Sequence, residues 1–580
     1  MTPKRIRRQL KRQLRGLIQT ARNRVFGRTP SAPRVRTNGA ELLRQHTEQF
    51  GTPEVIEVTD GVHLAIGFGL ANSVLLRGHD GVVIVDTLES DEAARPVKEA
   101  FDAITRDPVR AIIYTHNHAD HVFGSRTMAG DDAPEVYAHT TTRDHVLKIV
   151  SVVRPAIYRR SMRQFGALLG EGDHLNSGIG PRLLVGPSTA PGILWPTVTV
   201  EDHLAVEIAG LKLEMGHIPG ETPDHLYVWM PERGVLIPGD DYYHTFPNLY
   251  AIRGTAYRDV TQWFASIDRM IDLQPEVMVP CHTRPVHGKA EIRRRLTNYR
   301  DAIQFVHDQT VRGINEGLSP DEIVERVRLP ASLADEPYLR EHYGRVDWSV
   351  RSIFAGYLGW FDGDATNLHP LAPAERAKRM IDLAGGEARL LARARGAAEG
   401  NDTQWALELL KHLLALDPGH REALALRAQC LQVLGEGEIS ANGRNYYLTQ
   451  AREAEGSLDT PKSDPSVSGK NILDDIPLSA LFKSMAVALD ADGAAGTDAV
   501  LGFSFTDTGE DFTMHVRNCV AVVRPGRPQA AVARLTTTAR TFKEMLSGMR
   551  NPAVTLASRA VKVEGSPVEL VRVLALFKPS

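Results

Sequence analysis

Hydrophobic residues in the first third of the chain recur with the periods of strands and of a helix. They alternate with polar residues over 61–66 and 73–76, and they form a continuous run over 81–86, which is typical of a strand buried on both faces. Residues 91–104 follow a helical period, and 110–114 is a second buried strand. This alternation predicts an α/β layered fold, in which functional residues gather at the carboxyl ends of strands.

The pattern becomes helical beyond about residue 290 and stays so to about residue 450. Two apolar-periodic segments, 405–416 and 422–433, flank Asp417-Pro418 and predict a helical hairpin that is similar to one tetratricopeptide unit. A hairpin that only packs against its neighbours is the simpler interpretation, and we favour it over a peptide-binding repeat.

A small domain is predicted at the carboxyl end of the chain. Residues 456–469 are rich in Ser, Pro, Asp and Lys and have the composition of a linker. Beyond the linker, apolar and polar residues alternate over 501–505 and 512–516. A helical segment at 541–546, a strand-like segment at 561–563 and an apolar segment at 570–576 follow. Together these segments describe an α+β domain.

At 580 residues the chain is too long for one hydrophobic core. The patterns divide it into a basic amphipathic N-terminal segment at 1–40, a catalytic domain at 41–310, a helical domain at 311–455, the linker at 456–469 and a C-terminal domain at 470–580. The hydrophobic (42%) and charged (24%) fractions are ordinary for a soluble globular protein, and no stretch approaches the roughly 20 apolar residues that span a bilayer. The net charge of -3 provides no basic footprint, so nucleic acid is not an expected partner.

The cysteines indicate a reducing compartment. Cys281, Cys430 and Cys519 lie far apart and form neither a disulfide framework nor a Cys-x-x-Cys site. We therefore expect reduced thiols in a cytoplasmic protein.

The N-terminal segment is strongly basic, and its first acidic residue is Glu41. Its apolar residues recur every three or four positions, as in an amphipathic helix, and it lacks the apolar core of a Sec signal peptide. Three interpretations stay open: peripheral contact with an anionic membrane surface, a disordered basic tail, and a mitochondrial transit peptide.

The most specific signal for chemistry directly follows the predicted strand at 110–114. It is the cluster Thr115-His116-Asn117-His118-Ala119-Asp120-His121. Zinc prefers neutral imidazoles and carboxylates, and a tight loop after a strand brings such side chains together. His116 and His118 can serve one ion, and Asp120 and His121 can serve a second ion about 3.5–4 Å away. The spacing predicts two zinc ions per subunit, with a coincidental polar loop as the alternative.

Three later segments complete a pattern that resembles the metallo-β-lactamase superfamily. Its third, fourth and fifth metal motifs are matched by Ile218-Pro219-Gly220-Glu221, Leu236-Ile237-Pro238-Gly239-Asp240 and Val277-Met278-Val279-Pro280-Cys281-His282. The resemblance implies that Glu221 and His282 are further ligands and that Asp240 bridges both ions.

Several neighbours of these motifs also carry polar side chains. His217 competes with Glu221 as a ligand, but it precedes the Pro-Gly turn. His225 and Asp241 are expected to support the ligands without binding metal. Cys281 points away from its neighbour His282 in an extended segment, so we expect it in the core.

Glu221 narrows the resemblance, because most of the superfamily has His at this position and the alkyl sulfatases have Glu. Other stretches similar to that family are 159–160, 165–166, 178–180, 244–254, 357–363, 445–449 and 561–565. The resemblance covers nearly everything after about residue 45. It implies a metallo-β-lactamase αββα sandwich, an all-α helical dimerisation domain that forms a homodimer, and a small α+β domain similar to sterol carrier protein.

Two departures from the family concern the site. Asp240-Asp241 stands where the better-known alkyl sulfatases have Glu-Asn, and residues 183–197 do not match closely. We expect residues 183–197 to contribute to the substrate pocket.

A sulfate ester would need a cation of its own in such a site. The carboxylates of Asp120, Glu221 and Asp240, together with a hydroxide, cancel the charge of two zinc ions. Arg253 is the best candidate, because a guanidinium matches a tetrahedral oxyanion, and a surface ion pair is its alternative role. The other candidate substrate-binding residues are His244, Asn248 and Arg258.

These features predict a zinc-dependent hydrolase that uses metal-activated water to cleave alkyl sulfate esters to an alcohol and inorganic sulfate. Asp120 and Asp240 are the predicted catalytic carboxylates. Attack at sulfur and attack at carbon both stay open. The alternative is hydrolysis of another ester, a lactone, a thioester or a β-lactam at the same site. A lipid-binding scaffold conflicts with the complete ligand set. The C-terminal domain either concentrates the apolar tail of the substrate or only packs against the dimer.

Overall fold

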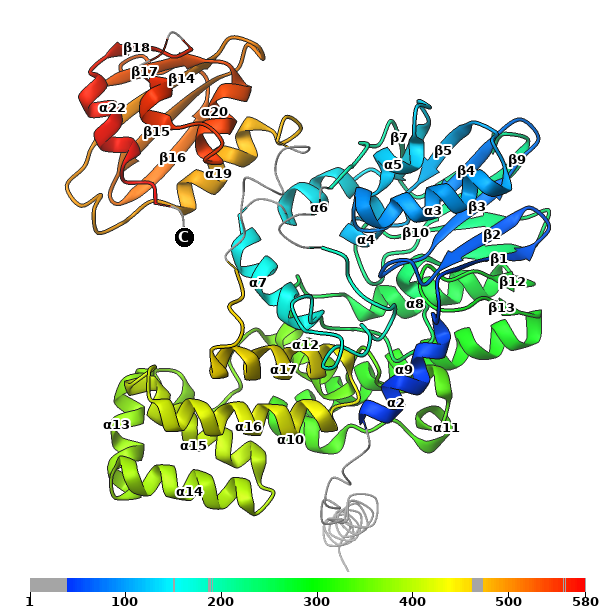
Figure 1. Ribbon diagram of the computed structural model, residues 1–580, viewed down its shortest axis with the longest axis horizontal. Helices are drawn as coiled ribbons and strands as arrows, with labels where there is room; N and C mark the ends of the chain where they lie inside the picture. The colour runs from blue at the N-terminus through cyan, green and yellow to red at the C-terminus, as the bar shows by residue number, and fades with distance from the viewer. Residues whose placement is uncertain are drawn as a thin grey trace, which may run out of the picture.

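The computed structural model describes residues 39–149, 152–185, 189, 191–461, 473–556, 558 and 560–578 (Figure 1). The basic segment predicted for 1–40 lies outside the described residues, except for the first two residues of α2 (Gly39–His46). Part of the predicted linker also lies outside them.

Two sheets form the centre of the catalytic domain. The first has the order β1-β2-β3-β4-β5-β6-β7, with antiparallel pairing from β1 to β4 and parallel pairing from β4 to β7. Its strands are β1 (Glu54–Thr59), β2 (Val62–Ile66), β3 (Ser73–Arg77), β4 (Val82–Val85), β5 (Val109–Ile113), β6 (Glu135–His139) and β7 (Val198–Val200). The second sheet has the order β13-β12-β11-β10-β9-β8. Its strands are β8 (His203–Ile208), β9 (Leu211–His217), β10 (Leu226–Met230), β11 (Val235–Ile237), β12 (Val277–Met278) and β13 (Val286–His287).

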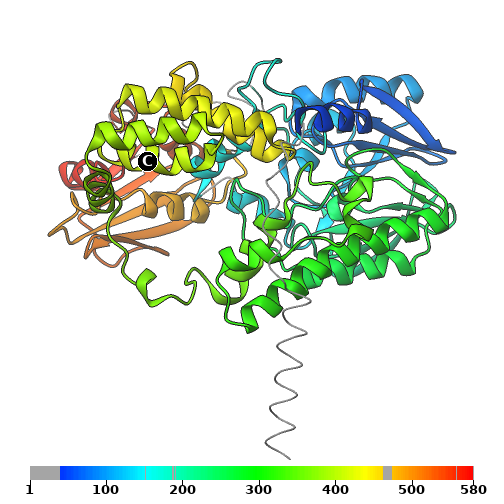
Figure 2. The ribbon, with the colours of Figure 1, turned by 90° about the horizontal axis from the view of Figure 1, so that it is seen from below.

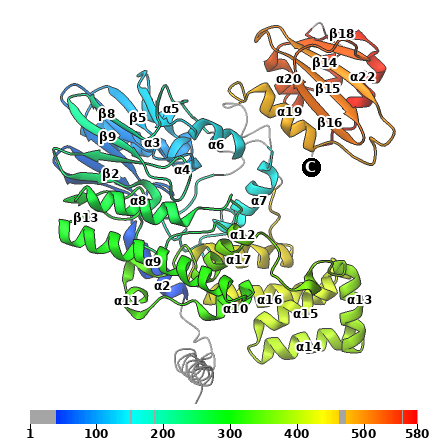
Figure 3. The same cartoon turned by 180° about the vertical axis from the view of Figure 1, so that it is seen from behind.

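The sheets pack face to face, and helices cover their outer faces (Figures 1 and 3). Val83 and Val85 of β4 belong to the apolar cluster between the sheets, whereas Ile84 belongs to the outer cluster with α3 (Asp91–Ile104). Successive side chains of a strand point to opposite faces, which explains why all of β4 is apolar. Helices α8 (Val260–Asp272) and α9 (Lys289–Asn315) cover the second sheet. The predicted αββα sandwich is confirmed.

Four shorter helices lie in the connections between β5, β6 and β7. They are α4 (Ala119–Val122), α5 (Ser125–Ala129), α6 (Thr142–Ile149) and α7 (Arg154–Gln164). Helix α7 joins the catalytic domain to the helical region, because Arg163 pairs with Glu453 at 3.0 Å and both are partly buried.

The region from α10 to α17 contains helices and no strand among its described residues. Its helices are α10 (Pro320–Arg326), α11 (Ala331–Ala334), α12 (Val346–Leu358), α13 (Pro373–Ala384), α14 (Glu387–Glu399), α15 (Thr403–Leu416), α16 (Arg421–Gly437) and α17 (Ala441–Glu455). Helices α15 and α16 form the predicted hairpin, which packs against its helical neighbours through an apolar cluster that includes Leu391, Leu410 and Ala423. Within the described residues, no helix is both long and apolar enough to cross a membrane.

The C-terminal domain contains one sheet of order β16-β15-β14-β17-β18 and helices on it. The strands are β14 (Ala499–Phe505), β15 (Asp511–Arg517), β16 (Val520–Pro525), β17 (Ala533–Thr537) and β18 (Lys562–Gly565), and the helices are α19 (Leu478–Val487), α20 (Ala539–Leu546), α21 (Pro552–Leu556) and α22 (Pro567–Leu574). The predicted α+β domain is confirmed. The apolar segment predicted at 570–576 belongs largely to α22, whose first turn Ser566 caps.

Candidate metal centre and substrate pocket

The histidine cluster predicted from the sequence lies where β5 ends and the one-turn helix α4 begins. His116 and His118 occupy the connecting loop, and Asp120 and His121 lie in α4. The loop is held by buried polar contacts, among them the Asn117 side chain, which donates a hydrogen bond to Asp224. The same Asp224 also accepts a hydrogen bond from Thr142 at 2.7 Å.

The structure brings all the predicted ligands together in two groups. The donor atoms of each group lie within 4.8 Å of one another; one group is His116, His118, Glu221 and Asp240, and the other is Asp120, His121 and His282. The Asp240 carboxylate faces both groups: its Oδ2 lies 3.9 Å from His116 Nε2 and 3.1 Å from His282 Nε2, and its Oδ1 lies 3.5 Å from His121 Nε2. This is the arrangement that a bridging ligand between two ions requires.

The chemistry of these side chains fits metal ions. His121 Nε2, Glu221 Oε2 and Asp240 Oδ1 are buried and have no hydrogen-bond partner among the described residues. Such atoms are costly to bury unless something binds them. Burial also holds the pKa of His116 and His118 well below the usual value, so their rings are neutral, as metal binding demands.

Hydrogen bonds behind the ligands orient their rings. His121 Nδ1 lies 2.7 Å from Asp86 Oδ2, and His282 Nδ1 donates to the carbonyl of Leu70 at 2.9 Å. Both contacts leave Nε2 facing the centre. Asp86 is a residue that the sequence interpretation missed. It follows β4 and adopts a left-handed backbone with φ of 57°.

The competing side chains lie outside the two groups. His217 Nε2 bonds the carbonyl of Pro223 at 2.7 Å, and His225 Nε2 accepts a hydrogen bond from the backbone N–H of Asp240 at 2.9 Å. Asp241 Oδ1 accepts the N–H of Glu221 at 3.0 Å. His225 and Asp241 therefore hold the backbone of ligand residues, and Cys281 is buried in the cluster between the sheets.

Glu221 is paired with Arg258 at 2.6 Å, and both side chains are almost completely buried. Burial raises the pKa of Glu221 to about 7, and the Arg258 charge opposes this rise. Arg258 also donates to the carbonyl of Asn248. Because its charge is already matched by Glu221, Arg258 is a poor candidate for binding the sulfate group.

Arg253 has no such carboxylate partner among the described residues. Its Nη2 lies 3.1 Å from His118 Nε2, and its backbone N–H donates to Gln164 at 2.8 Å. The guanidinium thus reaches the edge of the metal cluster, where an oxyanion would lie.

The other two predicted substrate-binding residues differ in their surroundings. The Asn248 side chain is buried, and neither its oxygen nor its nitrogen has a hydrogen-bond partner among the described residues. His244 lies 3.2 Å from Arg295 Nη1 and packs near Tyr338. It does not line either of the two cavities that reach the metal cluster.

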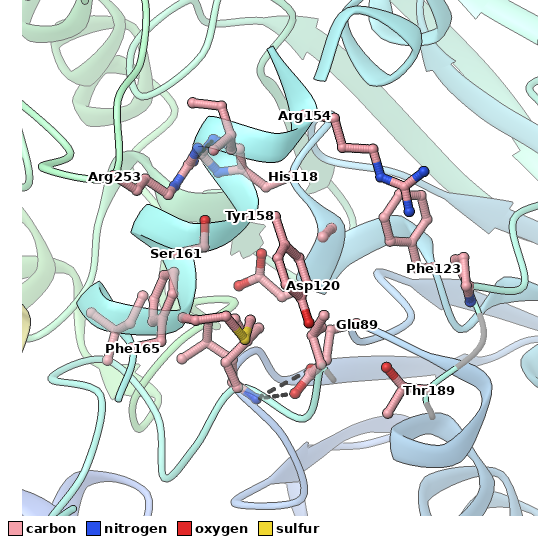
Figure 4. Close-up of a pocket in the computed structure, with 18 of the residues that line it drawn as sticks. Glu89, His118, Asp120, Phe123, Arg154, Tyr158, Ser161, Phe165, Thr189 and Arg253 are labelled. Atoms are coloured by element: carbon pink, nitrogen blue, oxygen red, sulfur yellow. Dashed lines mark hydrogen bonds between the residues drawn. The ribbon is translucent and has the colours of Figure 1, made fainter. Parts of the chain in front are cut away.

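An apolar pocket of about 200 Å³ opens onto the cluster (Figure 4). Its polar lining includes cluster residues, Arg253, Glu89, Arg154, Tyr158, Ser161, Thr189 and Tyr343. Its apolar lining includes Leu70, Phe123, Ile157, Met162, Phe165, Ile179, Leu183, Val185 and Ile476. Leu183 and Val185 belong to the stretch 183–197, which was expected to contribute to this pocket. Figure 4 shows His118 and Asp120 towards the centre, with Phe123 and Arg154 on one side.

Two lining residues had no signal in the sequence. Glu89 is buried in the wall, where it accepts the backbone N–H of Leu184 at 2.7 Å and of Leu70 at 3.2 Å (Figure 4). Burial raises its pKa to about 7 despite these bonds. Ile476 precedes α19, so the C-terminal domain contributes a side chain to the pocket of the catalytic domain.

An αββα sandwich with these motifs at one end of its sheets defines a hydrolase of the metallo-β-lactamase superfamily, which residues 66–282 match. Residues 319–457 match the alkyl sulfatase dimerisation region, and residues 466–580 match the alkyl sulfatase C-terminal region. The chain therefore belongs to the alkyl sulfatase family of this superfamily.

Individual relatives agree with this assignment. The chain is 36% identical over 519 residues to a linear primary-alkylsulfatase of Pseudomonas sp. (strain ATCC 19151), covering 87% of this chain and 98% of that protein. It is 30% identical to an alkyl/aryl-sulfatase of Saccharomyces cerevisiae, covering 90% of this chain and 82% of the relative. The solved structure of a stereoselective inverting sec-alkylsulfatase from Pseudomonas sp. superposes with a TM-score of 0.85 at 26% identity, covering 95% of this chain and 88% of that one.

Proposed function

We propose that this protein hydrolyses alkyl sulfate esters to an alcohol and inorganic sulfate. The observation that carries the proposal is an apolar pocket that meets a cluster of imidazoles and carboxylates beside Arg253. An alkyl sulfate has the same two parts, an apolar tail and a monoanionic head. The names of the relatives support the same substrate class.

In this proposal the site holds two zinc ions. His116, His118 and Glu221 would hold one ion and Asp120, His121 and His282 the other, and Asp240, which faces both groups, would serve both. Zinc, when bound, lowers the pKa of water and withdraws charge from an ester oxygen. The nearly complete burial of the ligand atoms keeps bulk water away and strengthens these effects.

Residues of the chain then position the ester and accept the proton. Arg253 binds the sulfate oxygens through its guanidinium, and the apolar wall holds the tail so that the ester bond faces the cluster. Asp120, Glu221 and Asp240 are the cluster carboxylates that line the pocket. Because Glu221 is paired with Arg258, Asp120 and Asp240 would accept the proton of the attacking water.

Turnover of a substrate panel by zinc-loaded protein tests the proposal. Alkyl sulfates should be hydrolysed, whereas lactones, thioesters and β-lactams should not; the reverse preference would overturn it. Arg253→Ala should lower kcat/KM about 10- to 100-fold, since a charge-assisted hydrogen bond contributes about 1.5–3 kcal/mol. Arg106→Ala, an exposed cation on the catalytic domain, is the control and should leave kcat/KM unchanged. Labelled water would show whether the alcohol or the sulfate takes up oxygen.

The helical region is proposed to form a homodimer. The chain from the end of α12 to α13 exposes Tyr357, Leu358, Trp360, Leu368 and Leu371, and Trp360 is 76% exposed. Figure 2 shows this connection extending away from the packed helices. Such a contiguous apolar stretch is costly in water unless a second subunit covers it.

Sedimentation of a tryptophan variant tests the dimer. Trp360→Ser should shift the protein towards monomer at micromolar concentration, because an exposed tryptophan at an interface often dominates its binding energy. Trp405→Ser is the matched control, since Trp405 is a less exposed tryptophan on α15. Equal sedimentation of wild type and Trp360→Ser would place the interface elsewhere.

A further inference from the structure

A second cavity also reaches the metal cluster at Arg253. Its volume is about 600 Å³, and it shares His118, Ile157, Glu221 and Arg253 with the apolar pocket. The two cavities therefore meet at the proposed position of the sulfate group. We call the second cavity the cationic groove, for the charges that line it.

The lining of the cationic groove is rich in basic side chains. Lys148 and Arg160 line it together with Arg253 and Arg258. Because Arg258 is paired with Glu221, Arg160 and Arg253 carry charges of the groove that this pair does not match.

One further carboxylate, that of Asp259, lines the groove. Asp259 accepts hydrogen bonds from Thr261 N–H and Oγ1 at 3.0 and 2.6 Å, and these bonds cap α8. The described lining thus has an excess of positive charge, in contrast with the apolar pocket.

Arg160 connects the groove to the loop that holds Arg253. Its Nε and Nη2 donate to the carbonyl of Ile252 at 3.2 and 2.6 Å. Arg160 belongs to the Arg159-Arg160 pair, one of the stretches similar to the alkyl sulfatases, and neither residue lines the apolar pocket. Of the two, Arg160 lines the groove and Arg159 does not.

The products of the proposed reaction need different exits. Inorganic sulfate is a dianion at neutral pH, and moving it through an apolar pocket that still holds the alcohol would cost much of its hydration. A groove lined by cations instead lowers the energy of the anion along its path.

We propose that the cationic groove binds inorganic sulfate and is the route by which it leaves, while the alcohol leaves through the apolar pocket. This inference rests on the proposed function. It assigns Arg160 to sulfate binding outside the metal cluster.

The test is product inhibition of alkyl sulfate turnover by added sodium sulfate. Arg160→Gln should raise the inhibition constant of sulfate about two- to fivefold, as expected for one solvent-screened charge contact. Arg159→Gln makes the same change of charge on the neighbouring exposed residue of α7 and should leave the constant unchanged. Arg160→Lys keeps the charge and should restore most of the wild-type constant.

A merely structural role for Arg160 gives different results. If the bond from Arg160 to Ile252 only positions Arg253, then Arg160→Gln should raise KM for the ester in parallel with the inhibition constant of sulfate. Arg160→Lys should then restore neither value. This result overturns the inference. Raising ionic strength should erase the difference between Arg160→Gln and wild type if charge is responsible. Equal sulfate constants in Arg160→Gln and Arg159→Gln also overturn the inference and leave the proposed function intact. Absence of alkyl sulfate turnover in zinc-loaded wild type overturns the proposed function itself.

Discussion

Asp86 offers the sharpest test of how the metal cluster is built. Its Oδ1 accepts the backbone N–H of Thr115 at 2.8 Å, and its Oδ2 accepts the Thr115 hydroxyl at 2.8 Å and faces His121 Nδ1 at 2.7 Å. Asp86→Asn changes one of these oxygens into an N–H donor. Whichever way the amide turns, a donor then faces a donor, and the negative charge behind the His121 ring is lost.

The magnitude follows from the contacts. Loss of a carboxylate behind a ligand histidine typically weakens metal binding 10- to 100-fold, which corresponds to about 1.4–2.8 kcal/mol. His121 belongs to only one of the two groups, so one of the two proposed zinc ions should bind more weakly and the other should keep its affinity. Competition with a chromophoric chelator, together with the zinc-to-protein ratio after dialysis, measures both quantities.

Controls separate this effect from a general loss of structure. Asp102→Asn removes a partly exposed carboxylate of α3 that pairs with Lys98 and should retain both ions. The thermal unfolding of metal-free Asp86→Asn should show a cooperative transition. The reasoning is refuted if Asp86→Asn binds two equivalents of zinc with wild-type affinity, or if it loses both equivalents together.

Two further predictions concern the pocket wall and the response to acid. Ile476→Ala should lower kcat/KM for long-chain alkyl sulfates about fivefold, because roughly 1 kcal/mol of apolar contact is lost, and should leave kcat/KM for short chains unchanged. Val487→Ala, on the exposed side of α19, is the control. A uniform change over all chain lengths would contradict the role of Ile476. Burial lowers the pKa of His46 to about 4, so between pH 6.5 and 4 only the unfolded chain takes up its proton, and stability falls as the pH falls. At pH 5 the loss in the free energy of unfolding is about 2 kcal/mol. Urea unfolding of wild type and His46→Gln at pH 5 and 7.5 measures this loss. An equal loss in both proteins would contradict the role of His46.

The fold could be predicted because its signals are local. The helix expected at 91–104 has those bounds in α3, since the Ser90 side chain caps its first turn. The buried run at 81–86 indicated a strand covered on both faces. The family resemblance supplied the arrangement of layers, which periodicity alone does not define.

The clustering of the proposed metal ligands could also be predicted, because each lies in a short motif at a strand end. Asp86 could not. Its role depends on the parallel register of β4 and β5, which aligns Val85 with Ile113 and so brings Asp86 beside Thr115. Ile476 was missed for a similar reason, because the docking of one domain on another leaves no period in the sequence. The charge of Arg258 could be read from the sequence, but its pairing with Glu221 could not.

That pairing restricts how such a site can change during evolution. A histidine at position 221, as in most of the superfamily, would leave Arg258 as an uncompensated buried cation, and loss of Arg258 alone would strand Glu221. Breaking a buried pair in this way costs about 3–5 kcal/mol, a large part of the stability of a typical domain. Neither single substitution is an easy step. Positions 221 and 258 are therefore expected to be inherited as a unit. A lineage that exchanged histidine for glutamate at position 221 must have passed through an unstable intermediate or changed both residues together.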